Sequence, residues 1–192
     1  MPDRAERSLS SSLSGALPRL TLVLGGARSG KSRYAEALIE AASAAPIYLA
    51  TAEARDEEMA ERIERHRARR GARWRLVEEP LALADRLLAE SRSDRAILVD
   101  CLTLWLSNLL LAGRDIDAEG AALIAALPKL SGPAVFVANE VGLGIVPENA
   151  MARIFRDQAG RLNQAIAARA DRVLFVAAGL PLILKDNSAT TR

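Results

Sequence analysis

Residues 25–32 have the types and spacing of a phosphate-binding loop. They fit the pattern G-x-x-x-x-G-K-[ST], between an apolar run at 20–24 and a segment with helical apolar spacing. Glycines let backbone N–H groups turn toward a triphosphate, and the positive end of the following helix attracts the same anion. Lys31 is expected to contact the β and γ phosphates, and Ser32 to offer its hydroxyl to Mg²⁺. The pattern predicts a nucleotide site rather than a chance glycine-rich turn, formed by Gly25, Gly26, Ala27, Arg28, Ser29, Gly30, Lys31 and Ser32.

A carboxylate that could complete the metal site is Asp100, which ends the aliphatic run at 96–99. Mg²⁺ prefers oxygen ligands, so one carboxylate, the Ser32 hydroxyl, water and phosphate oxygens would suit it. The alternative is an aspartate that only ends a strand or caps the next helix. The phosphate-binding pattern favours the metal role.

His66 is the only histidine, and it lies in the arginine-rich stretch 62–70. On a helix it shares one face with Met59, Ile63 and Arg70, which points the imidazole inward or toward a cleft. Neighbouring arginines disfavour the imidazolium form, and a neutral imidazole can attack phosphorus. A boundary residue on a solvated basic face is the alternative, and residue types and spacing leave the choice open.

Residues 139–149 form a long loop rich in glycine and apolar residues after a predicted strand. The loop keeps Val141, Leu143, Ile145 and Val146 together, which indicates that it covers a large substrate or a neighbouring subunit. The alternative is an ordinary hairpin packed on the core. Arginines in the following helix would face phosphates or water.

Composition limits the class of protein. The 192 residues are 50% hydrophobic, enough to bury a core without disulfides, and the single cysteine, Cys101, fits a reducing compartment. We find no signal-peptide pattern or long uninterrupted apolar segment, so we expect a cytoplasmic protein that does not bind a membrane. The net charge of +2 gives no support for nucleic acid as a partner.

The chain alternates short aliphatic runs with helical patterns, which predicts an α/β fold with a mostly parallel sheet. Residues 1–17 are serine-rich and are expected to form a flexible leader, with one catalytic domain at 18–192. Predicted strands are 20–24, 46–50, 95–100, 133–138 and 172–177, with a possible edge strand at 181–185. Predicted helices are 31–43, 55–70, 80–91, 103–112, 117–128 and 148–170. Ligands of such sheets bind at the carboxyl ends of the strands.

Several separated blocks resemble the bifunctional adenosylcobinamide kinase/adenosylcobinamide-phosphate guanylyltransferases of cobalamin biosynthesis. The blocks cover most of the chain after the leader: GGARSGKS at 25–32, YLATAEA at 48–54, DEEMAERIERHRARR at 56–70, W-R-x-x-E at 74–78, ILVDCLTLWLSNLL at 97–110, NEVGLGIVPEN at 139–149 and FRDQAGRLNQ at 155–164. The resemblance implies phosphorylation of adenosylcobinamide with ATP or GTP. It then implies transfer of GMP from GTP to adenosylcobinamide phosphate, which yields adenosylcobinamide-GDP and pyrophosphate.

The resemblance also assigns site residues. It implies a guanylylated histidine at His66, with Lys31 as the other catalytic residue. Beyond the phosphate-binding loop, it implies nucleotide contacts at Ala50, Thr51, Ala52, Arg67, Ala68, Arg69, Arg70, Glu78 and Asp100. Some relatives have glutamate where this chain has Asp100. The aspartate keeps the carboxylate but has the shorter reach. A P-loop NTPase with a RecA-like sheet is implied, and so is a homotrimer with active sites near subunit contacts.

Two other functions stay open from the sequence. A guanylyltransferase without the kinase activity would keep the same motifs. A RecA-like ATPase module is the second alternative, although the near-neutral charge and the lack of an aromatic and basic stacking surface disfavour it.

Overall fold

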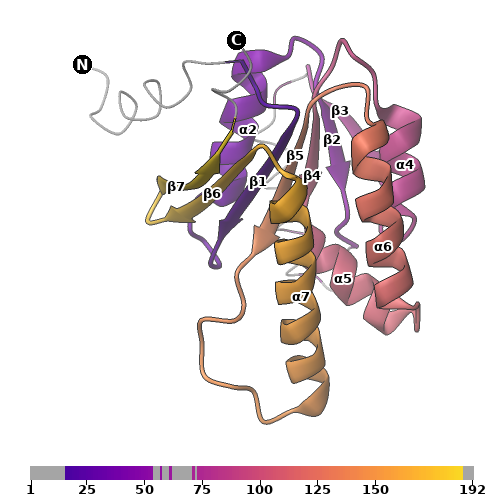
Figure 1. Ribbon diagram of the computed structural model, residues 1–192, viewed down its shortest axis with the longest axis vertical. Coiled ribbons are helices and arrows are strands. Elements are labelled where there is room, and N and C mark those ends of the chain that lie inside the picture. The colour runs from indigo at the N-terminus through magenta and orange to yellow at the C-terminus, as the bar shows by residue number, and fades with distance from the viewer. Residues whose placement is uncertain (1–15, 54–56, 58–60, 62–70, 72, 188–192) are drawn as a thin grey trace.

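A single seven-stranded sheet organises the described part of the chain. The computed structural model describes residues 16–53, 57, 61, 71 and 73–187. Within them the strand order is β3-β2-β4-β5-β1-β6-β7, and only β7 runs antiparallel to its neighbour (Figure 1). The strands are β1 (Leu20–Gly25), β2 (Ile47–Ala50), β3 (Arg75–Glu78), β4 (Ile97–Asp100), β5 (Ala134–Asn139), β6 (Arg172–Ala177) and β7 (Leu180–Asp186).

The two central strands are buried on both faces. Every residue of β1 is buried, and so are the first five of β5. Alternate side chains of β1 enter two different clusters, with Leu22 on one face of the sheet and Val23 on the other. A strand that is apolar nearly throughout is therefore the expected pattern at this position.

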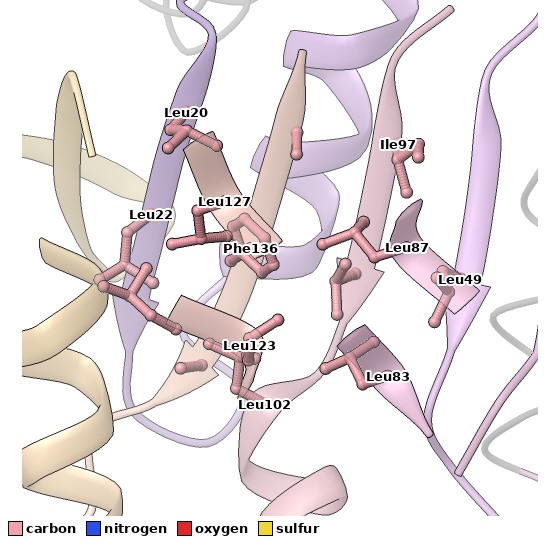
Figure 2. Packing of buried hydrophobic residues seen from close by; sticks show 14 of the residues in the cluster. Leu20, Leu22, Leu49, Leu83, Leu87, Ile97, Leu102, Leu123, Leu127 and Phe136 are labelled. Atoms are coloured by element: carbon pink, nitrogen blue, oxygen red, sulfur yellow. The ribbon is translucent and has the colours of Figure 1, made fainter. Parts of the chain in front are cut away.

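Helices cover both faces of the sheet. The helix α2 (Lys31–Ala42) packs Tyr34 and Ile39 against the Val23 face. The opposite face carries α4 (Leu83–Glu90), α5 (Leu102–Leu111), α6 (Ile116–Ala126) and α7 (Ala150–Arg169). Figure 2 shows side chains from the helices on this face, including Leu83, Leu102 and Leu123, gathered around Leu22, Leu49 and Phe136 of the strands. Each such buried side chain contributes about 2 kcal/mol of hydrophobic stabilisation.

The predicted α/β class and mostly parallel sheet are confirmed, and most predicted elements match the structure within a few residues. The strand β3 (Arg75–Glu78) is not among the predicted elements. Only Val77 is buried there, so this strand at the edge of the sheet has no continuous apolar run. The predicted helix 117–128 becomes a 3-10 turn at Leu127–Lys129, where Pro128 cannot donate a helical hydrogen bond.

Two predicted segments lie mostly outside the described residues. The predicted leader at 1–17 lies almost wholly outside the described residues, although Leu17 is partly buried against the α2 side of the core. Most of the helix predicted at 55–70 also lies outside them. No helix in the described part of the chain combines the length and hydropathy that a membrane span requires.

Candidate nucleotide-binding active site

The phosphate-binding loop joins the carboxyl end of β1 to the first residue of α2. Gly30 adopts φ 97°, in the left-handed region that favours glycine, and it precedes α2 without a side-chain cap. The first N–H groups of α2 are therefore available to an anion at the positive end of the helix. Ser29 N–H donates to the carbonyl of Gly26 over 3.3 Å, which closes the loop on itself.

The side chain of Lys31, the predicted catalytic lysine, folds back over this loop. Lys31 is buried, and its Nζ donates to the carbonyl of Gly26 over 3.1 Å. The ammonium group is thus held against the backbone of the loop. Its predicted contact with the β and γ phosphates stays a prediction. A bound triphosphate would offer oxygen acceptors in place of the Gly26 carbonyl.

The turn between β6 and β7 supports the loop from one side. Gly179 N–H donates to the carbonyl of Ser29 over 2.8 Å. A Cβ added at Gly30 would lie 3.1 Å from Cα of Gly179, and one added at Gly25 would lie 2.5 Å from the carbonyl oxygen of Val176. A side chain at either glycine would therefore clash with β6 or press against this turn.

Asp100 lies at the carboxyl end of β4, which β5 separates from β1. Its Oδ2 accepts a hydrogen bond from the Tyr48 hydroxyl over 2.8 Å, which fixes the orientation of the carboxylate. The second carboxylate oxygen, Oδ1, is the one that could bind another ligand. The donor set of Asp100 and Ser32 consists of oxygen atoms, as Mg²⁺ prefers.

The cysteine next to Asp100 is a structural residue. Burial raises the pKa of the Cys101 thiol from 9.0 to about 11, with a further upward contribution from the negative charge of Asp100 and a partial offset from Lys31. The thiol is therefore neutral near physiological pH and a poor nucleophile.

Thr51 ties the ends of β2 and β4 together. Its Oγ1 donates to the carbonyl of Cys101 and accepts from Cys101 N–H, each over 2.8 Å. Its N–H donates to the Asp100 carbonyl over 3.2 Å, and its own carbonyl accepts from Asn108 Nδ2 over 2.7 Å. The residue is fully buried. Thr51 therefore joins the ends of the two strands through its own hydrogen bonds, and Ala50 and Ala52 beside it are half-buried.

Two buried polar atoms at the loop have no hydrogen-bond partner within the described part of the chain: Asn139 Oδ1 and Ser29 Oγ. Asn139 is the parallel neighbour of Gly25 in the sheet, and its N–H donates to Thr103 Oγ1 over 2.7 Å. Buried polar atoms normally have partners, so both atoms are candidate contacts for a bound nucleotide or its waters. Asn139 is a polar residue at the end of an apolar strand, where the sequence predicts the walls of the site, but it is not among the predicted nucleotide contacts.

The sheet brings several predicted residues to one edge. Glu78 neighbours Ala50, and Ala50 neighbours Asp100, across the parallel pairs at the carboxyl ends of β3, β2 and β4. The phosphate-binding loop leaves the same edge from β1. The predicted residues His66, Arg67, Ala68, Arg69 and Arg70 lie outside the described residues.

Residues 21–184 match the family described as cobinamide kinase / cobinamide phosphate guanyltransferase. The chain belongs to this family. A Pseudomonas aeruginosa protein named bifunctional adenosylcobalamin biosynthesis protein CobP is 54% identical over 166 residues, which cover 85% of this chain and 96% of that protein. The Salmonella typhimurium protein named bifunctional adenosylcobalamin biosynthesis protein CobU is 45% identical over 181 residues, which cover 86% of this chain and 99% of that protein.

Solved structures support the fold of this family member. The flagellar accessory protein FlaH from Methanocaldococcus jannaschii has a TM-score of 0.52 and 15% identity, covering 99% of this chain and 89% of that one. A second solved structure, an ATPase domain, has a TM-score of 0.55 and 13% identity, covering 94% of this chain and 83% of that one. At these identities the likeness concerns the P-loop NTPase fold alone, and family membership sets aside the alternative of a RecA-like ATPase module.

Proposed function

We propose that this chain carries out both reactions of its family at one nucleotide site, and that GMP transfer passes through a covalent intermediate on His66. The chain is a kinase and a guanylyltransferase of cobalamin biosynthesis, the two activities of the family to which it belongs. The observation that carries the proposal is the convergence of a phosphate-binding loop, a buried lysine and an oriented carboxylate at one sheet edge. One loop then serves two transfers.

The kinase step is an in-line displacement at the γ phosphorus of ATP or GTP. The aminopropanol hydroxyl of adenosylcobinamide attacks, the bond to the bridging oxygen breaks, and the nucleoside diphosphate leaves. Lys31 would neutralise charge on the β and γ phosphates, and the first N–H groups of α2 would bind the same oxygens. Glu140 and Glu78 are the candidate bases for the hydroxyl proton, because Glu78 ends β3 and Glu140 follows β5 at this edge.

The guanylyl step divides one displacement between two large anions into two smaller ones. A ring nitrogen of His66 attacks the α phosphorus of GTP, the N–P bond forms, and pyrophosphate leaves. A phosphate oxygen of adenosylcobinamide phosphate then attacks the same phosphorus, and the N–P bond breaks to return a neutral imidazole. Arg67 and Arg70 would stabilise charge on the departing pyrophosphate.

Ser32 and Asp100 are the residues that would hold Mg²⁺. The described residues contain no cluster of three or more His, Cys, Asp or Glu side chains that could hold a metal alone. This fits Mg²⁺, because in phosphoryl-transfer enzymes the cation has few protein ligands and binds mainly substrate phosphates and water. Bound there, the cation would neutralise phosphate charge. Tyr48 would hold the carboxylate of Asp100 in place throughout.

We further propose a change of position between the two steps, because the γ phosphorus and the α phosphorus must be presented in turn beside one loop. Either the nucleotide or the segment that carries His66 would shift. Two nucleotides bound at separate, fully formed sites in one subunit would contradict this hypothesis. We also propose that the enzyme acts in the cytoplasm as a homotrimer, which sedimentation velocity would test.

The proposal is tested by intact-mass measurement after mixing the enzyme with GTP and Mg²⁺. The expected result is a mass gain of one GMP, mapped by peptide analysis to His66 and lost on addition of adenosylcobinamide phosphate. An adduct on another residue would overturn the assigned nucleophile. Incubation of the same enzyme with γ-labelled ATP and adenosylcobinamide distinguishes the bifunctional enzyme from a guanylyltransferase alone, which would form no labelled product.

A further inference from the structure

The loop after β5 exposes large apolar side chains at the edge of the sheet that holds the active site. Leu143 is 81% exposed and Ile145 is 98% exposed, and the same segment exposes Val146, Met151 and Ile154. We call these five residues the loop surface. Isolated exposed leucines are ordinary, but five large apolar side chains within twelve residues mark an interaction site. The alternative of a hairpin packed on the core is wrong for this loop.

The loop surface is held in place by hydrogen bonds of its own segment. Asn149 caps α7, because its Oδ1 accepts from Met151 N–H over 2.8 Å and from Ala152 N–H over 3.3 Å. Arg153 Nη1 donates to the carbonyl of Pro147 over 2.9 Å and to that of Glu148 over 2.6 Å. The backbone is thus fixed while the apolar side chains point outward. Such an arrangement is pre-organised for a ligand.

The segment that carries this surface begins, at Glu140, next to the phosphate-binding loop. Glu140 N–H donates to the carbonyl of Gly25 over 3.1 Å. Leu143 follows Glu140 by three residues, so its Cα lies at most about 11 Å away along the chain. In Figure 1 the segment runs from the end of β5 below the sheet to the start of α7, at the end where the loop between β1 and α2 also lies.

Polar groups follow the apolar ones along α7. Residues 151, 154, 158 and 161 are spaced by three or four, so they lie on one face of this helix. Gln158 and Arg161 line a cavity of about 410 Å³ between α5, α6 and α7. An amide or an oxygen acceptor on a ligand that covers Met151 and Ile154 would therefore meet hydrogen-bond donors one or two turns further on.

We propose that the loop surface binds one face of the corrin macrocycle of cobinamide and directs its aminopropanol hydroxyl to the phosphate-binding loop. The inference rests on the proposed function. A corrin ring presents methyl and methylene groups on its faces and amide side chains at its rim, which matches an apolar patch followed by Gln158 and Arg161. A ring of this size needs an open surface rather than a closed pocket. The hydroxyl must also reach the γ phosphate, which suits a surface whose segment starts at Glu140 beside Gly25.

The test measures corrinoid affinity apart from nucleotide chemistry. The double variant Ile145→Ser and Met151→Ser is compared with Leu111→Ser, whose leucine is 60% exposed at the end of α5, against 62% for Met151. The dissociation constant for adenosylcobinamide is measured without nucleotide, from corrin absorbance after ultrafiltration in the dark. We expect it to rise at least about tenfold in the double variant, equivalent to about 1.4 kcal/mol, and to stay unchanged in the control.

Chemical protection gives a second measurement. Cys101 is buried, so the thiol of an Ile145→Cys variant is the accessible one for a maleimide. Adenosylcobinamide is expected to slow its labelling, and to leave the labelling of a Leu111→Cys variant unchanged. Equal labelling rates with and without corrinoid would overturn the inference, and so would unchanged affinity in the double variant.

Two further readouts separate the explanations. Guanylylation of His66 by GTP needs no corrinoid, so it should persist in the double variant if the proposed function holds. No guanylylation of His66 in the parent enzyme would count against the proposed function. Guanylylation together with normal corrinoid affinity in the double variant would count only against corrinoid binding at the loop surface. Sedimentation of the double variant identifies the other occupant, because dissociation of an assembly with normal corrinoid affinity would assign the surface to a second copy of the chain.

Discussion

Replacing Thr51 with valine removes one hydroxyl from the centre of the site while keeping the shape of the side chain. The hydroxyl makes two hydrogen bonds of 2.8 Å, one to the carbonyl and one to the N–H of Cys101, in a residue that is fully buried. The substitution leaves the Cys101 N–H without a partner, at a cost of about 1–3 kcal/mol, and removes one of two bonds to the Cys101 carbonyl, which still accepts from Trp105 N–H, at a cost of about 1 kcal/mol. The free energy of unfolding should therefore fall by about 2–4 kcal/mol. For a chain of this size Tm should fall by roughly 5–15 °C.

Urea and thermal unfolding followed by circular dichroism would measure this change, with Thr51→Ser as the matched control. Serine keeps both hydrogen bonds and loses one methyl group, so its cost should be about 1 kcal/mol. Both transfers should also slow in the valine variant at temperatures where it stays folded, because the backbone of Asp100 and Cys101 is no longer held against β2. Equal unfolding free energies for the two variants would refute this account of the Thr51 network.

Three other substitutions test the chemistry. His66→Ala should abolish covalent GMP in intact-mass spectra while ATP-dependent phosphorylation of cobinamide survives at least in part; a retained adduct would identify another nucleophile. Lys31→Ala should slow both transfers by about 100-fold or more, since both need the polyphosphate held, and normal rates in either assay would contradict that role. Cys101 predicts a pH effect: the unfolded thiol ionises near pH 9.0 and the folded one near 11, so the unfolded chain binds fewer protons in between. Stability should fall by up to about 3 kcal/mol across this window relative to Cys101→Ala, which urea titrations at pH 8 and 11 would measure, and parallel pH profiles would exclude the shifted pKa.

Local patterns account for what could be predicted about the fold and the site. The phosphate-binding loop lies within eight residues, so its glycines, lysine and serine could be predicted from one short pattern. The strand before the loop and the helix after it were predicted with it. The central strands β1 and β5 are apolar nearly throughout because both of their faces are buried. The strand at Arg75–Glu78 was missed for the opposite reason, since one buried valine between exposed neighbours carries no periodic signal.

Contacts between residues far apart in the chain could not be predicted from the sequence. Tyr48 meets Asp100, and Thr51 meets Cys101, across about fifty positions, so neither pair has a spacing that a motif could encode. The packing of Gly179 against Ser29 and Gly30 likewise depends on how β6 and β7 sit beside β1.

By itself the sequence determined the family, the P-loop α/β class and the residue types available for phosphoryl chemistry, because these are written in short, continuous patterns. Only the tertiary structure decided which of those residues lie at the same edge of the sheet. It also decided which polar side chains form internal hydrogen bonds, as Thr51 does, and which apolar side chains stay exposed, as Ile145 does. The physical reason is that burial and hydrogen-bond partners depend on strand order and helix packing, which are set by the whole chain at once.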